Sequence, residues 1–122
     1  MPKLAYFTAD PVNEARLSEL GPPGVQAEAF AAKELDRPTE AYVRLYDLDS
    51  IAWGRAERAV LIRRLLDGAG PAAVHSYNLD PDEVKRLRAA GVLTARRLTP
   101  RLLARLARQA ARRSRREAAA RR

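Results

Sequence analysis

The sequence predicts an α/β fold in which a five-stranded, mostly parallel sheet lies between two layers of helices. Strand-like and helix-like segments alternate five times within the 122 residues, and the segments that join them are short. Three of the expected helices also begin with a capping residue followed by proline. Because parallel strands need crossovers that pass over the sheet, and the alternating helices supply them, this order predicts a three-layer sandwich in a single domain.

The first strand and helix lie within the first 24 residues. Residues 4–7 form a short apolar run, which predicts a buried strand. Asp10 supplies an N-cap and Pro11 the first helical position, and the apolar spacing that follows predicts a helix up to Leu20. The glycine–proline run at residues 21–24 ends this helix.

The next two strands are separated by a polar segment. Residues 25–29 alternate apolar and polar side chains, as a half-buried strand does, and residues 33–39 are polar and broken by proline, which leaves room for a helical stub. Residues 41–46 are aromatic and branched and predict the third strand. Arg44 is unexpected there, because central parallel strands are almost continuously apolar. Either Arg44 extends outward at the strand's end or the strand lies near an edge.

The strongest helix signal covers residues 54–67. Its apolar side chains fall on one broad face, and Gly68 ends it. We expect Leu61, Ile62 and Leu65 to be core residues of this helix.

Two further strand–helix pairs complete the pattern. Residues 72–76 predict the fourth strand, and Asp80 and Glu83 form a capping box at the start of the next helix. Residues 92–98 predict the fifth strand, and Thr99 with the following proline begins a final amphipathic helix. The inward face of that helix consists of Leu102, Leu103, Leu106 and Ala110.

Positive charge is concentrated in the last third of the chain. Residues 1–83 hold 9 Lys+Arg against 14 Asp+Glu, a net charge of −5, whereas residues 84–122 hold 14 against 1, a net charge of +13. This favours an anionic partner, whether nucleic acid, a membrane surface or an acidic protein; the alternative is that arginine is simply this chain's common surface residue. The candidate anion-binding residues are Arg105, Arg108, Arg112, Arg113, Arg115 and Arg116.

The domain is expected to span residues 1–110, with an arginine-rich extension at residues 111–122. Beyond Ala111 the apolar face ends. Without a packing face, we expect the extension to be frayed or to extend into solvent unless a partner orders it.

Composition excludes several classes of site. With no cysteine and one histidine, the chain cannot form disulfides, thiolate nucleophiles, cysteine-based zinc sites or multi-histidine metal sites, although carboxylate-only metal sites stay open. No apolar run could cross a bilayer and no signal-peptide pattern is present, so we expect a cytoplasmic protein. Neither a nucleophile–base pair nor a glycine-rich phosphate loop is recognisable, so we expect no enzymatic activity, cofactor or bound metal.

Polar side chains gather where the predicted strands end, which is where functional groups collect in open α/β sheets. Thr8 and Asp10 follow the first strand, Asp47 the third, Ser76 the fourth and Thr99 the fifth. These are the positions at which we look for a site.

The β–α order repeats five times over about residues 3–110, and three short motifs accompany it, Leu45-Tyr46-Asp47, Ala90-Gly91-Val92 and Leu98-Thr99-Pro100. In this order and these motifs the chain resembles the receiver domain of two-component response regulators. The resemblance implies a flavodoxin-like sheet, with Asp47 at the phosphoacceptor position and Ser76 or Tyr77 at the position of the switch hydroxyl.

Charges that a working receiver needs are missing at the matching positions. The family has an acidic pair after the first strand and a lysine before the proline that follows the fifth, and these groups balance the charge of the metal and the transferred phosphate. Here Thr8 and Ala9 replace the acidic pair and Thr99 replaces the lysine. The resemblance therefore implies a degenerate receiver, a pseudo-receiver, in which Asp47, Ser76 and Thr99 are vestigial.

The same residues have ordinary structural explanations. Asp10, Asp80 and Thr99 each precede proline at a helix start, so capping explains them. Asp47 lies at a turn, where aspartate commonly makes local hydrogen bonds. His75, alone in an apolar strand, is expected to be a hydrogen-bonded structural residue.

Two classes of function remain. The first is a receiver-like signalling or scaffolding module that binds another protein, independently of phosphorylation, through the last strand and its flanking helices. The alternative is a sequence-tolerant nucleic-acid-binding protein that contacts phosphates with its basic C-terminal helix. A homodimer is compatible with either class.

Overall fold

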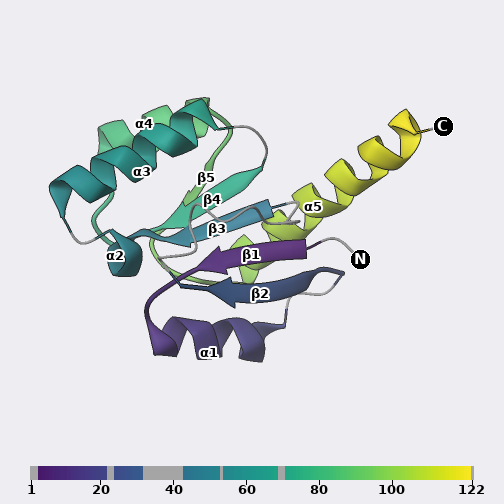
Figure 1. The fold of residues 1–122 in the computed structure, drawn as a ribbon, viewed down its shortest axis with the longest axis horizontal. Helices are drawn as coiled ribbons and strands as arrows, with labels where there is room; N and C mark the ends of the chain where they lie inside the picture. Colours follow the sequence, from purple (N-terminus) through teal and green to yellow (C-terminus); the bar gives the residue numbers. More distant parts are fainter. Residues whose placement is uncertain (1–2, 22–23, 32–42, 53, 69–70, 122) are drawn as a thin grey trace.

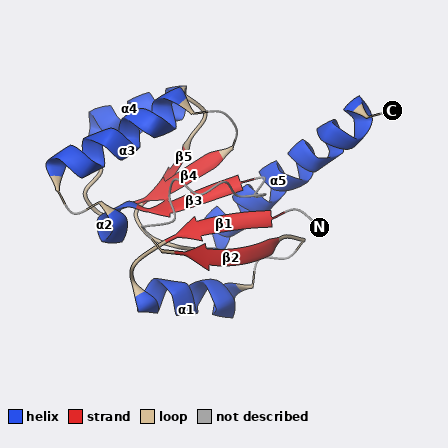
Figure 2. Cartoon of the chain, viewed as in Figure 1, coloured by secondary structure: helices blue, strands red, loops and turns tan. Residues whose placement is uncertain are grey.

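The computed structural model describes residues 3–21, 24–31, 43–52, 54–68 and 71–121, and it has the predicted α/β architecture (Figures 1 and 2). Its sheet has the strand order β2-β1-β3-β4-β5, and all neighbouring strands are parallel. The elements are β1 (Lys3–Phe7), α1 (Pro11–Leu20), β2 (Gln26–Phe30), β3 (Val43–Asp47), α2 (Leu48–Ile51), α3 (Arg55–Asp67), β4 (Ala72–His75), α4 (Pro81–Ala89), β5 (Leu93–Ala95) and α5 (Pro100–Ala120).

Helices cover both faces of the sheet, which confirms the three layers. On one face, Leu17 of α1 and Leu103 of α5 pack with Leu45 of the central strand in one buried cluster. On the other, Leu65 of α3 and Leu87 of α4 belong to a second cluster. The expected core residues of α3 are confirmed: Leu61, Ile62 and Leu65 are all buried.

The position of Arg44 is explained by the strand's end and not by the sheet's edge. β3 is the central strand, and Val43 and Leu45 on either side of Arg44 are completely buried. The Arg44 side chain is exposed, one residue from the amino end of β3. Of the two explanations offered by the sequence, the outward extension at the strand end is therefore the correct one. The predicted stub at residues 33–39 and the first residues of the predicted strand, 41–42, lie outside the described residues.

Three predicted helix caps are confirmed. The Asp10 side chain accepts a hydrogen bond from the Val12 N–H, and Asp80 accepts one from the Glu83 N–H. The Thr99 hydroxyl oxygen accepts one from the Leu102 N–H at 3.1 Å. Each cap satisfies a backbone donor that the first helical turn leaves without an intrahelical partner.

The fifth strand is shorter than predicted, and one short helix was not predicted. β5 ends at Ala95, because the chain bends at the exposed Arg96 and Arg97 and then places Leu98 in the buried cluster that contains the leucines of α5. The four residues of α2 follow β3 directly. So short a segment has no periodicity by which a sequence could predict it.

Of the two outcomes expected for the C-terminal extension, fraying is not found within the described residues, and the extension instead reaches into solvent as a helix. α5 is one helix of 21 residues that continues to Ala120 and passes beyond the amino ends of the strands (Figure 1). Alanine and arginine both favour helix, and Arg113 and Glu117 form an ion pair one turn apart, at 3.4 Å. The predicted inward face is confirmed, since Leu102, Leu103, Leu106 and Ala110 are all buried. No described helix is long and apolar enough to span a bilayer.

Candidate functional site

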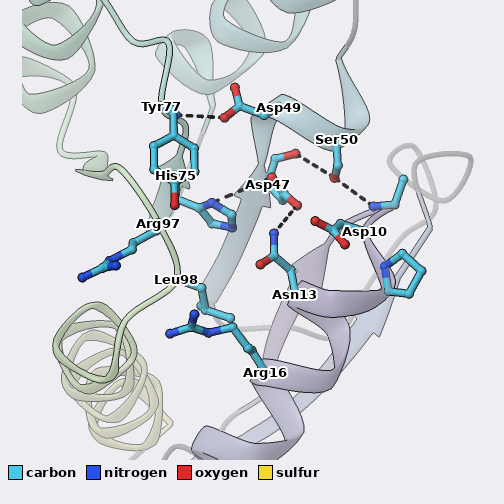
Figure 3. Close-up of a pocket in the computed structure, with 12 residues that line it drawn as sticks. Asp10, Asn13, Arg16, Asp47, Asp49, Ser50, His75, Tyr77, Arg97 and Leu98 are labelled. Atoms are coloured by element: carbon cyan, nitrogen blue, oxygen red, sulfur yellow. Dashed lines mark hydrogen bonds and ion pairs between the residues drawn. The ribbon is translucent and has the colours of Figure 1, made fainter.

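A cavity of about 480 Å³ opens at the carboxyl ends of β1, β3 and β4 (Figure 3). The loop after β1, the start of α1, the start of α2 and the loop before α5 all contribute to its lining. Among its polar lining residues are Asp10, Asn13, Arg16, Asp47, Asp49, His75 and Arg97. It therefore lies at the sheet edge where the sequence placed the candidate site.

Asp47 is the buried centre of this site. It is the last residue of β3, and its side chain is only 3% exposed. Its Oδ2 accepts a hydrogen bond from the Thr8 hydroxyl at 2.8 Å. The same oxygen accepts one from the Asn13 amide at 2.9 Å, while Oδ1 faces His75 Nδ1 at 3.8 Å (Figure 3). Asp47 thus connects β1, α1 and β4 to the central strand.

His75 lines the cavity and connects Asp47 to the buried Tyr6, which does not line it. Burial lowers the pKa of His75, and this outweighs the opposite effects of Asp47, Asp49 and Asp10. The pKa of Tyr6 is raised, first by burial and then by the charge of Asp47. We therefore assign a neutral imidazole whose Nε2 accepts the Tyr6 hydroxyl at 2.5 Å and whose protonated Nδ1 faces Asp47. The predicted hydrogen bond of His75 is confirmed.

A second carboxylate, Asp49, is held by the segment after β4. It accepts hydrogen bonds from the Ser76 hydroxyl at 2.5 Å and from the Tyr77 N–H at 2.8 Å, and Arg58 lies 3.7 Å away. Partial burial alone would raise the pKa of Asp49, but these hydrogen bonds, that of Asn78 and the charge of Arg58 together hold it below its ordinary value.

Thr8 and Ser50 join the loop after β1 to α2. Ser50 Oγ accepts the Ala9 N–H at 2.9 Å, and Thr8 Oγ1 accepts the Asp10 N–H at 3.1 Å. Thr8 thus donates to Asp47 while its own oxygen receives a backbone donor. At the place where the resemblance implies a metal-binding acid, this chain has a hydroxyl group committed to internal hydrogen bonds.

The predicted site residues do not all meet at the cavity. Asp47 lines it, but the Ser76 side chain points to Asp49 and the neighbouring Tyr77 lines the cavity instead. Thr99 caps α5 and is not among the described lining residues, whereas Arg97, two residues earlier, is. A cation from the loop before α5 therefore does border the site.

Sequence reasoning missed Asn13, Arg16 and Arg97. The first two lie three residues apart and so share one face of α1, which is a weak signal in a helix where half of the residues are polar. Arg97 was indistinguishable from the many other arginines. Within the described ranges no three acidic, histidine or cysteine side chains come together as a metal site would require.

The candidate anion-binding arginines all lie on α5, and none of them lines the cavity at Asp47. Arg105, Arg108, Arg112, Arg115 and Arg116 are exposed, and Arg113 is half-buried beside Glu117. Three of them, Arg112, Arg113 and Arg116, line a separate cavity at the amino ends of the strands.

Comparisons with known proteins bear on the fold. No family model matches the sequence, and no curated protein matches it. Among solved structures, a crystal structure described as a response regulator receiver protein from Pseudoalteromonas atlantica superimposes with a TM-score of 0.69 over 93% of this chain and 99% of that chain, at 16% sequence identity. The sheet order, the layers and this superposition together show that the chain has the flavodoxin-like fold of a response regulator receiver domain.

Proposed function

We propose that this chain is a receiver-like signalling or scaffolding module that acts by binding another protein and does not require phosphorylation. The observation that carries the proposal is the engagement of Asp47. Its Oδ2 receives two hydrogen bonds, its Oδ1 faces the imidazole of His75, and the side chain is almost completely buried. A carboxylate in this position has little freedom to attack a phosphoryl donor, because attack needs an accessible lone pair with a nearby counter-charge.

The neighbouring residues favour the same interpretation. Thr8 is committed to Asp47, and Asp10 caps α1. Neither arrangement requires a metal. Ser76, at the position of the switch hydroxyl, is committed to Asp49. These polar side chains therefore have hydrogen-bond partners within the chain, as expected of a receiver-like scaffold that no longer takes part in phosphoryl transfer.

The surface through which such a module would act is formed by α4, β5 and α5. β5 is an edge strand, so its outer backbone edge faces away from the sheet. Arg88 of α4 donates a hydrogen bond to the Thr94 hydroxyl at 3.3 Å, which places a guanidinium over this strand, and Arg96 and Arg101 beside it are exposed. A basic surface of this kind favours an acidic protein partner.

Phosphorylation is tested by intact-mass spectrometry after incubation with acetyl phosphate and Mg²⁺. We expect no increase in mass. A stable adduct of one phosphate that disappears in Asp47→Asn would show that the proposed independence from phosphorylation is wrong.

Partner binding is tested by affinity capture with the full chain as bait. A specific partner should be lost in Arg88→Glu/Arg96→Glu and retained both in Asp47→Asn and in the matched control Arg55→Glu/Arg63→Glu, which makes the same charge change on α3. Retention of all partners by the first variant, or equal loss in the control, would reject the α4–β5–α5 surface.

A further inference from the structure

A second cavity lies at the opposite edge of the sheet from Asp47. It has a volume of about 520 Å³ and is bounded by Pro71 before β4, by Ala90 and Gly91 before β5, and by the C-terminal half of α5. α5 reaches this place because it continues past the amino ends of the strands (Figure 1). None of the described residues that line the cavity is acidic.

Arg112 and Arg116 give this cavity a strong positive charge. They lie one helical turn apart, so their side chains project from the same flank of α5. Both are exposed, and neither forms a hydrogen bond or ion pair with any part of the chain that the structure describes. Arg113, the third arginine of the lining, is paired with Glu117 at 3.4 Å. Two guanidinium groups therefore border the cavity with their donors uncommitted.

Gln109 supplies an independent observation. Its side-chain carbonyl oxygen is buried and has no hydrogen-bond partner, the one such buried side-chain atom among the described residues. Gln109 also lines the cavity, one turn of α5 before Arg112 and Arg113. A buried acceptor without a donor is unfavourable until something supplies the missing hydrogen bond.

We propose that this cavity binds a small phosphate ester. The phosphate lies between Arg112 and Arg116, whose planar donor groups match its oxygens. An N–H or O–H group of the same molecule donates to the Gln109 carbonyl oxygen once this side chain rotates toward the cavity, because the oxygen is buried in the unbound chain. Nucleotides and sugar phosphates share this chemistry, and the cavity has the volume usual for ligands of that size. The site is separate from the Asp47 site and does not depend on the proposed function.

The test is isothermal titration of the full chain at low salt with adenosine monophosphate, ribose 5-phosphate and inorganic phosphate. At least one ester should bind more tightly than inorganic phosphate, and the better ester shows whether base or sugar supplies the donor. In Arg112→Gln/Arg116→Gln the affinity for the esters should fall about tenfold or more, as expected when hydrogen bonds to a charged group are lost. The control Arg55→Gln/Arg63→Gln removes the same charge from α3 and should bind as the unmodified chain does.

Gln109→Leu separates the two halves of the proposed recognition. This variant should retain affinity for inorganic phosphate but lose the additional affinity for the esters. Equal ester affinities in the α5 double variant and its α3 control would overturn the proposal. So would binding of a 20-nucleotide single-stranded DNA when no small ester binds, because arginines that act only as an exposed basic surface would give that result.

Discussion

Asp47 illustrates how one side chain can organise the end of a sheet. It accepts hydrogen bonds from Thr8 of the loop after β1 and from Asn13 of α1, and it faces His75 of β4. Hydrogen bonds to charged groups are among the stronger stabilising contacts in proteins, and losing one partner leaves the other buried and unpaired. The network should therefore stabilise the fold whatever its role in function.

Replacing Thr8 with valine should measure this contribution. The shape is kept but the donor to Asp47 is lost, so we expect the free energy of unfolding to fall by about 1.5–3 kcal/mol. Urea denaturation provides the measurement. Thr8→Ser keeps the hydroxyl and is the control. If the two variants are equally stable, the hydrogen bond at 2.8 Å contributes nothing.

The buried His75 should make the fold sensitive to mild acid. Because burial lowers its pKa in the folded state, the unfolded chain binds a proton more readily, and stability falls as the pH decreases below the unfolded value of about 6.5. We expect the urea midpoint to drop between pH 7.5 and pH 5.5, and His75→Gln to reduce that drop. The pKa of Asp49 is also lowered, so its protonation reduces stability only at more acidic pH than that of His75. An equal drop in the variant would assign the acid sensitivity to other groups.

Among the elements, the helices were the most predictable, because a helix cap and the apolar periodicity that follows it depend on residues close together in the sequence. Asp10, Asp80 and Thr99 each begin a helix where the sequence placed them. The ends of two elements were predicted wrongly. β5 ends early, where the chain bends at two exposed arginines. α5 continues beyond its buried face, because residues of high helix propensity remain helical when they extend a helix that is already packed.

α3 allows a matched test of packing. Leu65 is 8% exposed, whereas Val60 on the same helix is 61% exposed. Leu65→Ala should destabilise the protein by about 2–5 kcal/mol, and Val60→Ala should change stability by no more than about 0.5 kcal/mol. Both values come from urea denaturation. Similar losses in the two variants would mean that the buried face of α3 is not the one described.

Shortening α5 tests whether residues 111–122 are separable from the domain. Ending the chain at Ala111 keeps Leu102, Leu103, Leu106 and Ala110, which are the buried residues of the helix. We expect a cooperative thermal transition within a few degrees of that of the full chain, followed by circular dichroism. A chain ended at Ala104 loses Leu106 and Ala110 and should unfold. Loss of the transition in the first truncation would show that the extension belongs to the core.

For the whole molecule, the fold was predictable and the site only in part. Alternation of strands and helices is a property of the entire chain, so single errors at element ends did not change the topology. Asp47 could be placed because it ends a strand. Its partners could not, since Asn13 and His75 reach it from elements 34 and 28 residues away, and nothing in their own neighbourhoods marks them as contacts.

The continuous α5 also determines how the molecule should behave in solution. A helix of 21 residues is about 31 Å long, and its last turns stand clear of the sheet (Figure 1). Drag depends on the longest dimension, so the monomer should migrate through a sizing column ahead of a sphere of equal mass. An early elution volume is therefore not evidence of a dimer, and a mass from light scattering or sedimentation is needed to distinguish one elongated copy from a pair.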